Sequence, residues 1–258
     1  MQGFPYRLER WPTQQVLFRA LTDHLEHHLR QRLGSAGPSK PLGLATGRTM
    51  EPLYAALVQR LGAWSQSDLE MLRRGWSSFN LDEYRALPAA DPRSYRSFMT
   101  HHLGQPLQLS AERLRLPDGM AVDGEDTALV YSQALQAQGG IGLQLLGLGC
   151  NGHVGFNEPP SDAECPCRVV RLSQDTRDQN SAMFGGDPAA VPLEAITLGL
   201  KEILAAHEIH LVVTGAAKAG ILRRLLMTTE PDAQLPASWL WCHRQVWVWA
   251  DAAALPSP

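Results

Sequence analysis

Short apolar runs of strand length alternate along this chain with longer segments of helical periodicity. The clearest helical segment, residues 13–33, carries apolar side chains at the spacing of a single helix face. Such alternation predicts an α/β protein with an open, mostly parallel, Rossmann-like sheet and helices on both of its faces. A length of 258 residues with 44% hydrophobic composition is compatible with one large domain, so we expect a single domain over residues 1–258.

The turns that follow four of the expected strands carry polar side chains, and they begin at Thr46, Asp82, Asn151 and Thr214. In an open parallel sheet, ligands bind in the crevice outside the carboxyl ends of the strands. We therefore expect these four turns to meet at one edge of the sheet and to form the functional site.

The loop after the apolar run 141–148 is the richest of these turns in chemical groups. Glycines at positions 147, 149, 152 and 155 let the backbone turn sharply, and the same loop holds His153 and Glu158. A histidine and a carboxylate at such a place are suited to proton transfer. A lone histidine would more often cap a turn, but the glycine spacing and the nearby carboxylate favour a functional role here.

The other turns offer an anion site and further ionisable groups. Residues 46–49, Thr-Gly-Arg-Thr, precede a helical pattern, and the backbone N–H groups at such a helix start suit a phosphate, although Thr-Gly turns also serve as plain N-caps. Asp82 and Glu83 follow a buried strand and are catalytic candidates; alternatively, Asp82 caps a turn and Glu83 is solvated. Lys218 lies in the first turn of a helix, where it either faces a ligand or is solvated.

The composition excludes several classes of protein. With 23 basic and 26 acidic residues, the net charge of −3 gives no electrostatic signature of nucleic-acid or membrane binding. No apolar run approaches the roughly 20 residues needed to cross a bilayer, and the first residues lack the apolar segment of a signal peptide. We therefore expect a soluble cytoplasmic protein.

The cysteines and histidines do not predict a metal site. The four cysteines are too few and too irregular for a disulfide framework, and the spacing of Cys165 and Cys167 is not that of a usual ligand pair. His24, His27 and His28 share one expected helix, where a metal site would need facing partners. Charged residues beside them favour a solvated helix face, and no metal is expected.

Five segments together resemble the glucosamine-6-phosphate deaminase family, also called isomerases, in the family's order and over most of the chain. They are residues 44–49, 79–84, 92–98, 147–159 and 215–218. The superfamily also includes 6-phosphogluconolactonases, but the Asp-Glu-Tyr and Gly-Phe-Asn-Glu-Pro segments resemble the deaminase branch. The resemblance implies conversion of glucosamine 6-phosphate and water to fructose 6-phosphate and ammonia, in amino-sugar catabolism, without a metal or organic cofactor.

The resemblance also implies a role for each candidate residue. His153 would open the sugar ring by moving a proton to the ring oxygen, for which a pKa near neutrality is suitable. Asp82 would move a proton between C2 and C1, and Glu158 would orient and polarise His153, as a carboxylate fixes a catalytic imidazole elsewhere. The 6-phosphate would be bound by Thr46, Gly47, Arg48, Thr49, Lys218 and Gly152.

Two positions of the expected catalytic site depart from the family pattern. Asn151 stands where many members have Asp, and it can orient His153 but supplies no charge. Ala182 stands where the pattern has a phosphate-binding Arg. Our hypothesis is that Arg48, in a turn position that is often Gly in the family, replaces that charge from across the phosphate.

Three alternatives remain open at the level of sequence. Segments 196–204, 213–215 and 235–241 resemble galactosamine-6-phosphate deaminase/isomerase, which would give tagatose 6-phosphate. A 6-phosphogluconolactonase would need the histidine but no base at C2, so Asp82 distinguishes the two reactions. A catalytically silent sugar-phosphate sensor is disfavoured, because the chain has no DNA-binding extension. Family members include hexamers and smaller forms, so a homo-oligomer is compatible with the sequence.

Overall fold

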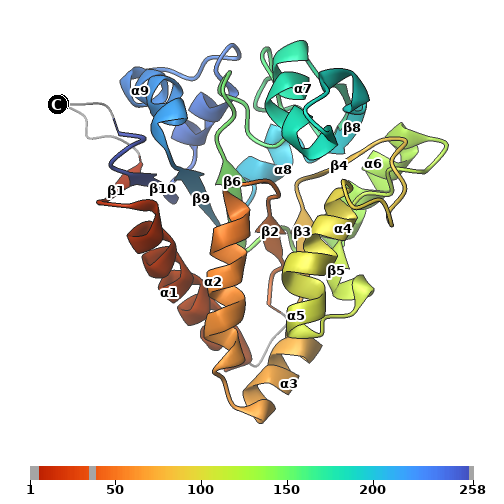
Figure 1. Cartoon of the computed structure of the whole chain (residues 1–258), viewed down its shortest axis with the longest axis vertical. Coiled ribbons are helices and arrows are strands. Elements are labelled where there is room, and N and C mark those ends of the chain that lie inside the picture. The colour runs from red at the N-terminus through yellow and green to blue at the C-terminus, as the bar shows by residue number, and fades with distance from the viewer. Residues whose placement is uncertain (1–5, 35–38, 256–258) are drawn as a thin grey trace.

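The computed structural model describes residues 6–34 and 39–255, and it contains a seven-stranded sheet in which every neighbouring pair of strands is parallel. The strands lie in the order β1-β10-β9-β6-β2-β3-β5 (Figure 1). Their bounds are β1 Arg7–Trp11, β10 Val246–Asp251, β9 Glu208–Val213, β6 Leu143–Gly147, β2 Leu42–Leu44, β3 Ser78–Asn80 and β5 Leu114–Arg115. This arrangement confirms the predicted open α/β fold.

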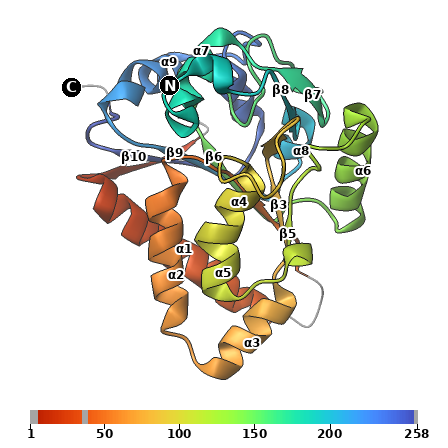
Figure 2. The same ribbon diagram turned by 45° about the vertical axis from the view of Figure 1, so that its right-hand side comes forward.

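The helices cover both faces of this sheet, as predicted (Figures 1 and 2). Connections from β1 through β2 and β3 to β5 step across the sheet in one direction, and later connections step back. Because such crossovers are right-handed, the two sets of helices lie on opposite faces. The first set is α1 Gln14–Leu33, α2 Met50–Gly62, α3 Gln66–Gly75, α4 Tyr95–Met99 and α5 Gln105–Leu107; the second is α6 Gly124–Ala137, α8 Leu200–Leu204 and α9 Ala219–Met227.

Three strands leave the main sheet and form a small antiparallel sheet in the order β4-β8-β7. They are β4 Asp82–Tyr84, β8 Glu194–Thr197 and β7 Arg168–Arg171. The sequence predicted one mostly parallel sheet, with a turn beginning at Asp82, and it did not predict this second sheet. Apolar runs of this length identify a strand but not its partner, and that partner is chosen by contacts far apart in the chain. The two-residue β5 is too short to give a recognisable pattern in the sequence.

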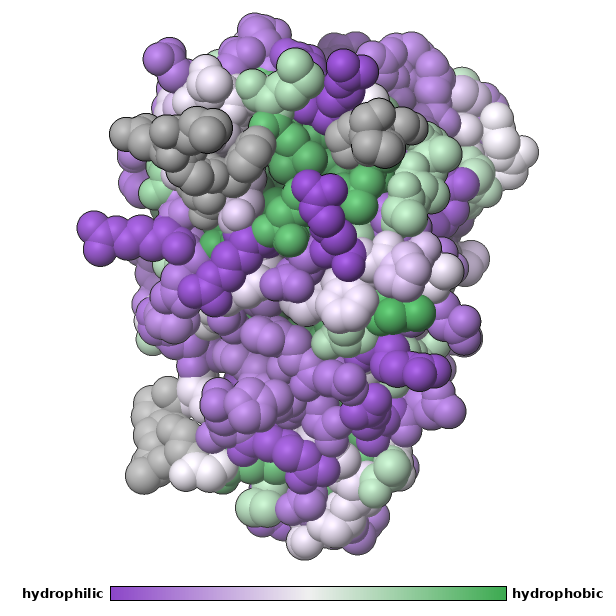
Figure 3. Space-filling model, turned by 90° about the vertical axis from the view of Figure 1, so that its left-hand side faces the viewer, coloured by the Kyte–Doolittle hydropathy of each residue, from purple (hydrophilic) through white to green (hydrophobic). Residues whose placement is uncertain are grey.

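Helix α1 shows how the sequence produces this packing. Thr13 accepts a hydrogen bond from the backbone N–H of Val16 (3.3 Å), so the helix begins with a satisfied N-cap. Leu17, Leu21 and Leu25 are among its buried side chains, and each contributes about 1.5–3 kcal/mol by its burial. The side of the molecule that carries α1 is largely hydrophilic over its lower half (Figure 3).

Among the helices that the structure describes, none combines the length and the apolar character required to cross a membrane.

Candidate active site

A cavity of about 230 Å³ lies at the carboxyl edge of the parallel sheet. All four predicted turns contribute to its lining. Of the predicted site residues, the lining includes Thr46, Gly47, Arg48, Thr49, Asp82, His153 and Lys218. The strands β2, β3, β6 and β9 end at this edge, which explains why residues so distant in the sequence meet there.

The turn 46–49 lies directly before α2. Thr49 is at the N-cap position of this helix, yet its side chain makes no capping hydrogen bond. The structure therefore does not support the alternative interpretation of this segment as a plain N-cap. The first backbone N–H groups of α2 lie beside the cavity, where they can attract an anion.

The adjacent carboxylates Asp82 and Glu83 point to different places. Asp82 faces the cavity, whereas Glu83 is buried and accepts hydrogen bonds from the backbone N–H groups of Tyr84 (2.9 Å), Tyr95 (3.0 Å) and Arg96 (2.7 Å). Glu83 thus fixes the start of α4 and is not the solvated residue of the alternative prediction. Successive side chains of a strand point to opposite sides, so only one of the pair is available to a ligand.

The environment of Asp82 makes its carboxyl group hold a proton more tightly than usual. Burial, and then the charge of Glu83, raise the pKa of Asp82 well above its ordinary value. A carboxylate with a raised pKa is a stronger base when it is ionised. A cationic group bound in the cavity would favour that ionised form.

His153 is buried and held in one orientation by Asn151. The Oδ1 atom of Asn151 lies 2.7 Å from His153 Nδ1 and also accepts the backbone N–H of His153 (3.2 Å). An amide oxygen can only accept, so the ring proton is on Nδ1 and the lone pair is on Nε2. Gly149 makes this placement possible, because a Cβ atom there would lie 2.3 Å from Nε2 of the ring.

The sequence led us to expect a pKa near neutrality for His153, and the structure contradicts that expectation. Burial lowers it to about 4, and the attraction of Glu158 only partly opposes that effect. The imidazole is therefore neutral at physiological pH. A neutral imidazole with a free lone pair on Nε2 can accept a proton from a hydroxyl group and return it to another oxygen.

Glu158 does not orient the ring directly. Its carboxylate accepts hydrogen bonds from the backbone N–H (2.8 Å) and the hydroxyl (2.6 Å) of Ser173, and from the hydroxyl of Thr176. Ser173 is the N-cap of α7 (Gln174–Asn180), so Glu158 fixes the start of that helix. The hydrogen bond that orients His153 comes from Asn151, and Glu158 acts on the ring through its charge.

Gly152 also lies elsewhere than predicted. It is absent from the lining of the cavity among the described residues, and its backbone adopts a positive φ of 89°. A Cβ atom at this position would lie 2.3 Å from Leu235 Cδ1, and the backbone oxygen accepts the N–H of Ala237 (2.9 Å). Gly152 thus allows the loop to turn and to pack on the segment around Leu235.

Helix α7 contributes residues that the sequence analysis missed. Gln179 and Asn180 line the cavity, and Gln179 Oε1 accepts hydrogen bonds from the backbone N–H of Cys150 (3.1 Å) and from Lys218 Nζ (3.5 Å). Lys218 also lies 3.2 Å from the sulfur of Cys150. Periodicity can indicate a short helix, but it cannot show which edge of the sheet that helix covers.

Comparison with known proteins agrees with this geometry. A family model described as glucosamine-6-phosphate isomerases/6-phosphogluconolactonase matches residues 12–249. The chain belongs to this family. Glucosamine-6-phosphate deaminase 2 of Giardia intestinalis is 38% identical over 226 residues, which cover 86% of this chain and 84% of that protein. Glucosamine-6-phosphate deaminase 2 of Bacillus subtilis (strain 168) is 40% identical over 217 residues, covering 83% and 84% respectively.

Solved structures share the fold. A glucosamine-6-phosphate deaminase described as monomeric is 32% identical, with a TM-score of 0.87 over 96% of this chain and 98% of that one. A 6-phosphogluconolactonase from Leishmania guyanensis is 20% identical, with a TM-score of 0.69 over 96% and 97% of the two chains. The second likeness shows a common fold alone.

The charged residues that line the cavity differ from those that the family resemblance led us to expect. Ala182 lines the cavity where the pattern has a phosphate-binding Arg. Arg48 and Lys218 line the same cavity. Arg48 and Lys218 therefore line the same cavity that the side chain of an Arg at position 182 would enter.

Replacing Glu83 and Asp82 separately will test the division of roles between them. Glu83→Ala removes the acceptor of three backbone N–H groups, so we expect it to lower the free energy of unfolding by about 3 kcal/mol. Asp82→Asn removes a buried charge that burial disfavours and leaves stability unchanged or higher. Urea denaturation of both variants at pH 7 measures this, and equal losses of stability would contradict the assignment.

Asn151→Asp will change the protonation of His153. A carboxylate beside Nδ1 favours the imidazolium form, so the pKa of His153 will rise from about 4 toward the usual value of about 6.5. The neutral imidazole then predominates only at higher pH. Any activity that needs the neutral imidazole will therefore decrease first at the acidic end of its pH profile. Titration of the ring by NMR gives the pKa, with Asn151→Ala as the control that removes the hydrogen bond without adding a charge. A pKa in Asn151→Asp no higher than in the control would refute this account.

Proposed function

We propose that the protein is a glucosamine-6-phosphate deaminase, which converts glucosamine 6-phosphate and water to fructose 6-phosphate and ammonia. The observation that carries this proposal is that Asp82 and the neutral ring of His153 face one cavity. The reaction needs both a group that shuttles a proton between oxygens and a base that acts on carbon. Deaminases among the relatives are 38–40% identical, which supports this branch of the family over the lactonases.

The first step of the proposed reaction opens the sugar ring. His153 Nε2 accepts the proton of the hydroxyl group on C1 and delivers it to the ring oxygen, so the C1–O bond to the ring breaks and an aldehyde forms. Asn151 keeps the ring proton on Nδ1 throughout, which leaves Nε2 free for the transfer. A neutral imidazole in a buried site can do this without first losing a proton to water.

The second step moves a proton between carbons. Asp82 removes the proton from C2 and returns it to C1, while a proton passes from the amino nitrogen to the aldehyde oxygen, so C1 becomes an alcohol and an imine remains at C2. Water then adds to C2, a proton from the added water passes to the nitrogen, and the C2–N bond breaks to give the ketone and ammonia. The amino group of the substrate is cationic when protonated, so its arrival beside Asp82 favours the ionised form that this step requires.

The phosphate group of the substrate would lie at the start of α2. The backbone N–H groups of residues 46–49 and the cations of Arg48 and Lys218 surround this end of the cavity. With Ala182 in place of the family's Arg, we propose that Arg48 supplies the second charged contact.

We also infer that the enzyme acts in the cytoplasm and needs no metal or organic cofactor for catalysis. All four cysteines are free thiols, which is typical of a reducing compartment. The proposed steps use only proton transfers by protein side chains. The monomeric description of the solved deaminase indicates that a homo-oligomer is not required in every relative.

The proposed activity predicts ammonia release from glucosamine 6-phosphate. We expect Asp82→Asn to reduce kcat by about 100-fold or more, because the base for the carbon-bound proton is lost. Galactosamine 6-phosphate and 6-phosphogluconolactone are assayed in parallel, with the wild-type protein and with Asp82→Asn. Release of ammonia from galactosamine 6-phosphate alone would establish the alternative that gives tagatose 6-phosphate. Hydrolysis of the lactone that persists in Asp82→Asn, with no ammonia from either amino sugar, would establish the lactonase.

Arg48→Ala will weaken binding of the phosphorylated sugar. Loss of a charged hydrogen bond to phosphate should raise KM by about 10- to 100-fold, with a smaller change in kcat. The double variant Arg48→Ala/Ala182→Arg should recover part of the affinity, because the charge returns from the opposite wall. Arg74→Ala, on the exposed surface, is the control for loss of an arginine. An unchanged KM in Arg48→Ala would disprove the replacement of charge.

A further inference from the structure

The wall of the cavity formed by α7 and by the 3₁₀ helix that follows it, Ser181–Phe184, has few side chains that can donate a hydrogen bond. Ala182 and Met183 line the cavity there, and neither side chain has a donor. Asn180 also lines the cavity, but its amide nitrogen donates to the hydroxyl of Tyr84 (3.0 Å). Among the described residues of this wall, Gln179 is therefore the one whose amide nitrogen is left for a ligand.

The hydrogen bonds of Gln179 fix the orientation of its amide group. Its Oε1 atom accepts the backbone N–H of Cys150 (3.1 Å) and lies 3.5 Å from Lys218 Nζ. Both of these groups can only donate, so the atom that faces them is the oxygen. The Nε2 atom lies on the other arm of the planar amide, and no described residue accepts a hydrogen bond from it. Its two N–H groups are therefore free to bind a ligand in the cavity.

Lys218, beside this amide, keeps its positive charge available to a ligand. Its Nζ atom lies 3.2 Å from the sulfur of Cys150 and 3.5 Å from Gln179 Oε1. Neither contact is with a carboxylate, and Lys218 forms no ion pair within the described part of the chain. An ammonium group and two amide N–H groups are thus neighbours on the lining of the cavity.

This pair of donors suits a phosphate group better than a sugar hydroxyl. Phosphate oxygens carry negative charge, and hydrogen bonds to an ionised acceptor are stronger than those between neutral groups. A neutral hydroxyl would gain little from the charge of the ammonium group. The start of α2 and Arg48 add further donors to the same cavity.

We propose that Gln179 binds the phosphate group of the substrate through Nε2, while its Oε1 atom holds Lys218 and the loop at Cys150 in position. The proposal rests on the proposed function, since it takes an amino-sugar 6-phosphate as the ligand. Gln179 lies three residues before Ala182, and side chains at this spacing share one side of a helix. The amide thus supplies a donor near the place from which the family's Arg would reach the phosphate. Because Oε1 is already held by two donors, the amide loses little rotational freedom when it binds.

Removal of this amide should weaken phosphate binding. We expect Gln179→Ala to raise KM for glucosamine 6-phosphate by about 10-fold, the effect of losing one hydrogen bond to a charged group, and to raise the inhibition constant of inorganic phosphate by a similar factor. Gln174→Ala is the matched control, because Gln174 is an exposed residue of the same helix that bonds to Asp178 and does not line the cavity. It should leave both constants unchanged.

Two further substitutions separate the donor of Gln179 from its acceptor. Gln179→Glu keeps an oxygen for Cys150 and Lys218 but replaces the donor with negative charge, so both constants should rise above those of Gln179→Ala. Gln179→Lys supplies a donor without an acceptor, so both constants should fall below those of Gln179→Ala. A side chain that only positioned the loop and Lys218 would give the reverse order, with Gln179→Glu nearest to the wild type. That order, any other departure from the expected one, or wild-type constants in Gln179→Ala would overturn the proposal.

Calorimetric titration with inorganic phosphate distinguishes failure of this proposal from failure of the proposed function. If the Kd for phosphate follows the expected order but neither amino sugar releases ammonia, Gln179 binds phosphate and the assigned reaction is wrong. If the wild type releases ammonia and Gln179→Ala leaves the Kd unchanged, the role of Gln179 alone is refuted. Circular dichroism and the Tm of each variant confirm that it is folded.

Discussion

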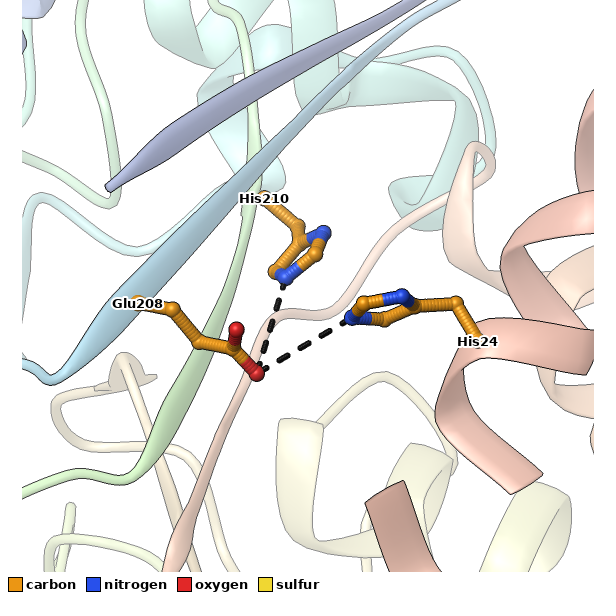
Figure 4. Close-up of side chains that lie close together, drawn as sticks. All are labelled: His24, Glu208 and His210. Carbon is orange, nitrogen blue, oxygen red and sulfur yellow. Dashed lines mark ion pairs between the residues drawn. The ribbon is translucent and has the colours of Figure 1, made fainter. Parts of the chain in front are cut away.

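The parallel pairing of the seven-stranded sheet is the constraint on which the rest of the structure depends. Because every strand runs in the same direction, the carboxyl ends of β2, β3, β6 and β9 meet at one edge, and each contributes a turn to the cavity. The amino ends meet at the opposite edge, toward which Glu208 lies. The same pairing therefore separates the proposed catalytic centre from the cluster of His24, Glu208 and His210 (Figure 4).

Two carboxylates, the buried Glu83 and the half-buried Glu158, fix the starts of helices beside the cavity. Glu83 accepts the backbone N–H groups at the start of α4, and Glu158 does the same for α7 through Ser173. Backbone N–H groups at a helix N-terminus stabilise a carboxylate that accepts from them, which offsets part of the cost of burying Glu83. The helices that they fix carry Tyr95 and Gln179 to the wall of the cavity.

The burial of the two candidate catalytic groups shifts their pKa values in opposite directions. Burial lowers the pKa of His153 to about 4, and it raises the pKa of Asp82. Both changes favour the neutral form, because a charge is poorly solvated there. Burial thus leaves the imidazole of His153 neutral and makes Asp82 a stronger base once a cationic substrate favours its ionised form, which is the pairing that the proposed deamination requires.

The sequence by itself determined the α/β class, the long first helix and the four turns that carry the site, because these follow from local periodicity and from glycine and polar residues at strand ends. It also identified Asp82, His153, Lys218 and the turn 46–49 as cavity residues. Only the tertiary structure decided the partners of Glu158 and Asn151, the antiparallel pairing of β4, β8 and β7, and the meeting of His24 with Glu208. Each of these depends on which segments pack together and on how deeply a group is buried, and neither property is contained in the local pattern of residues.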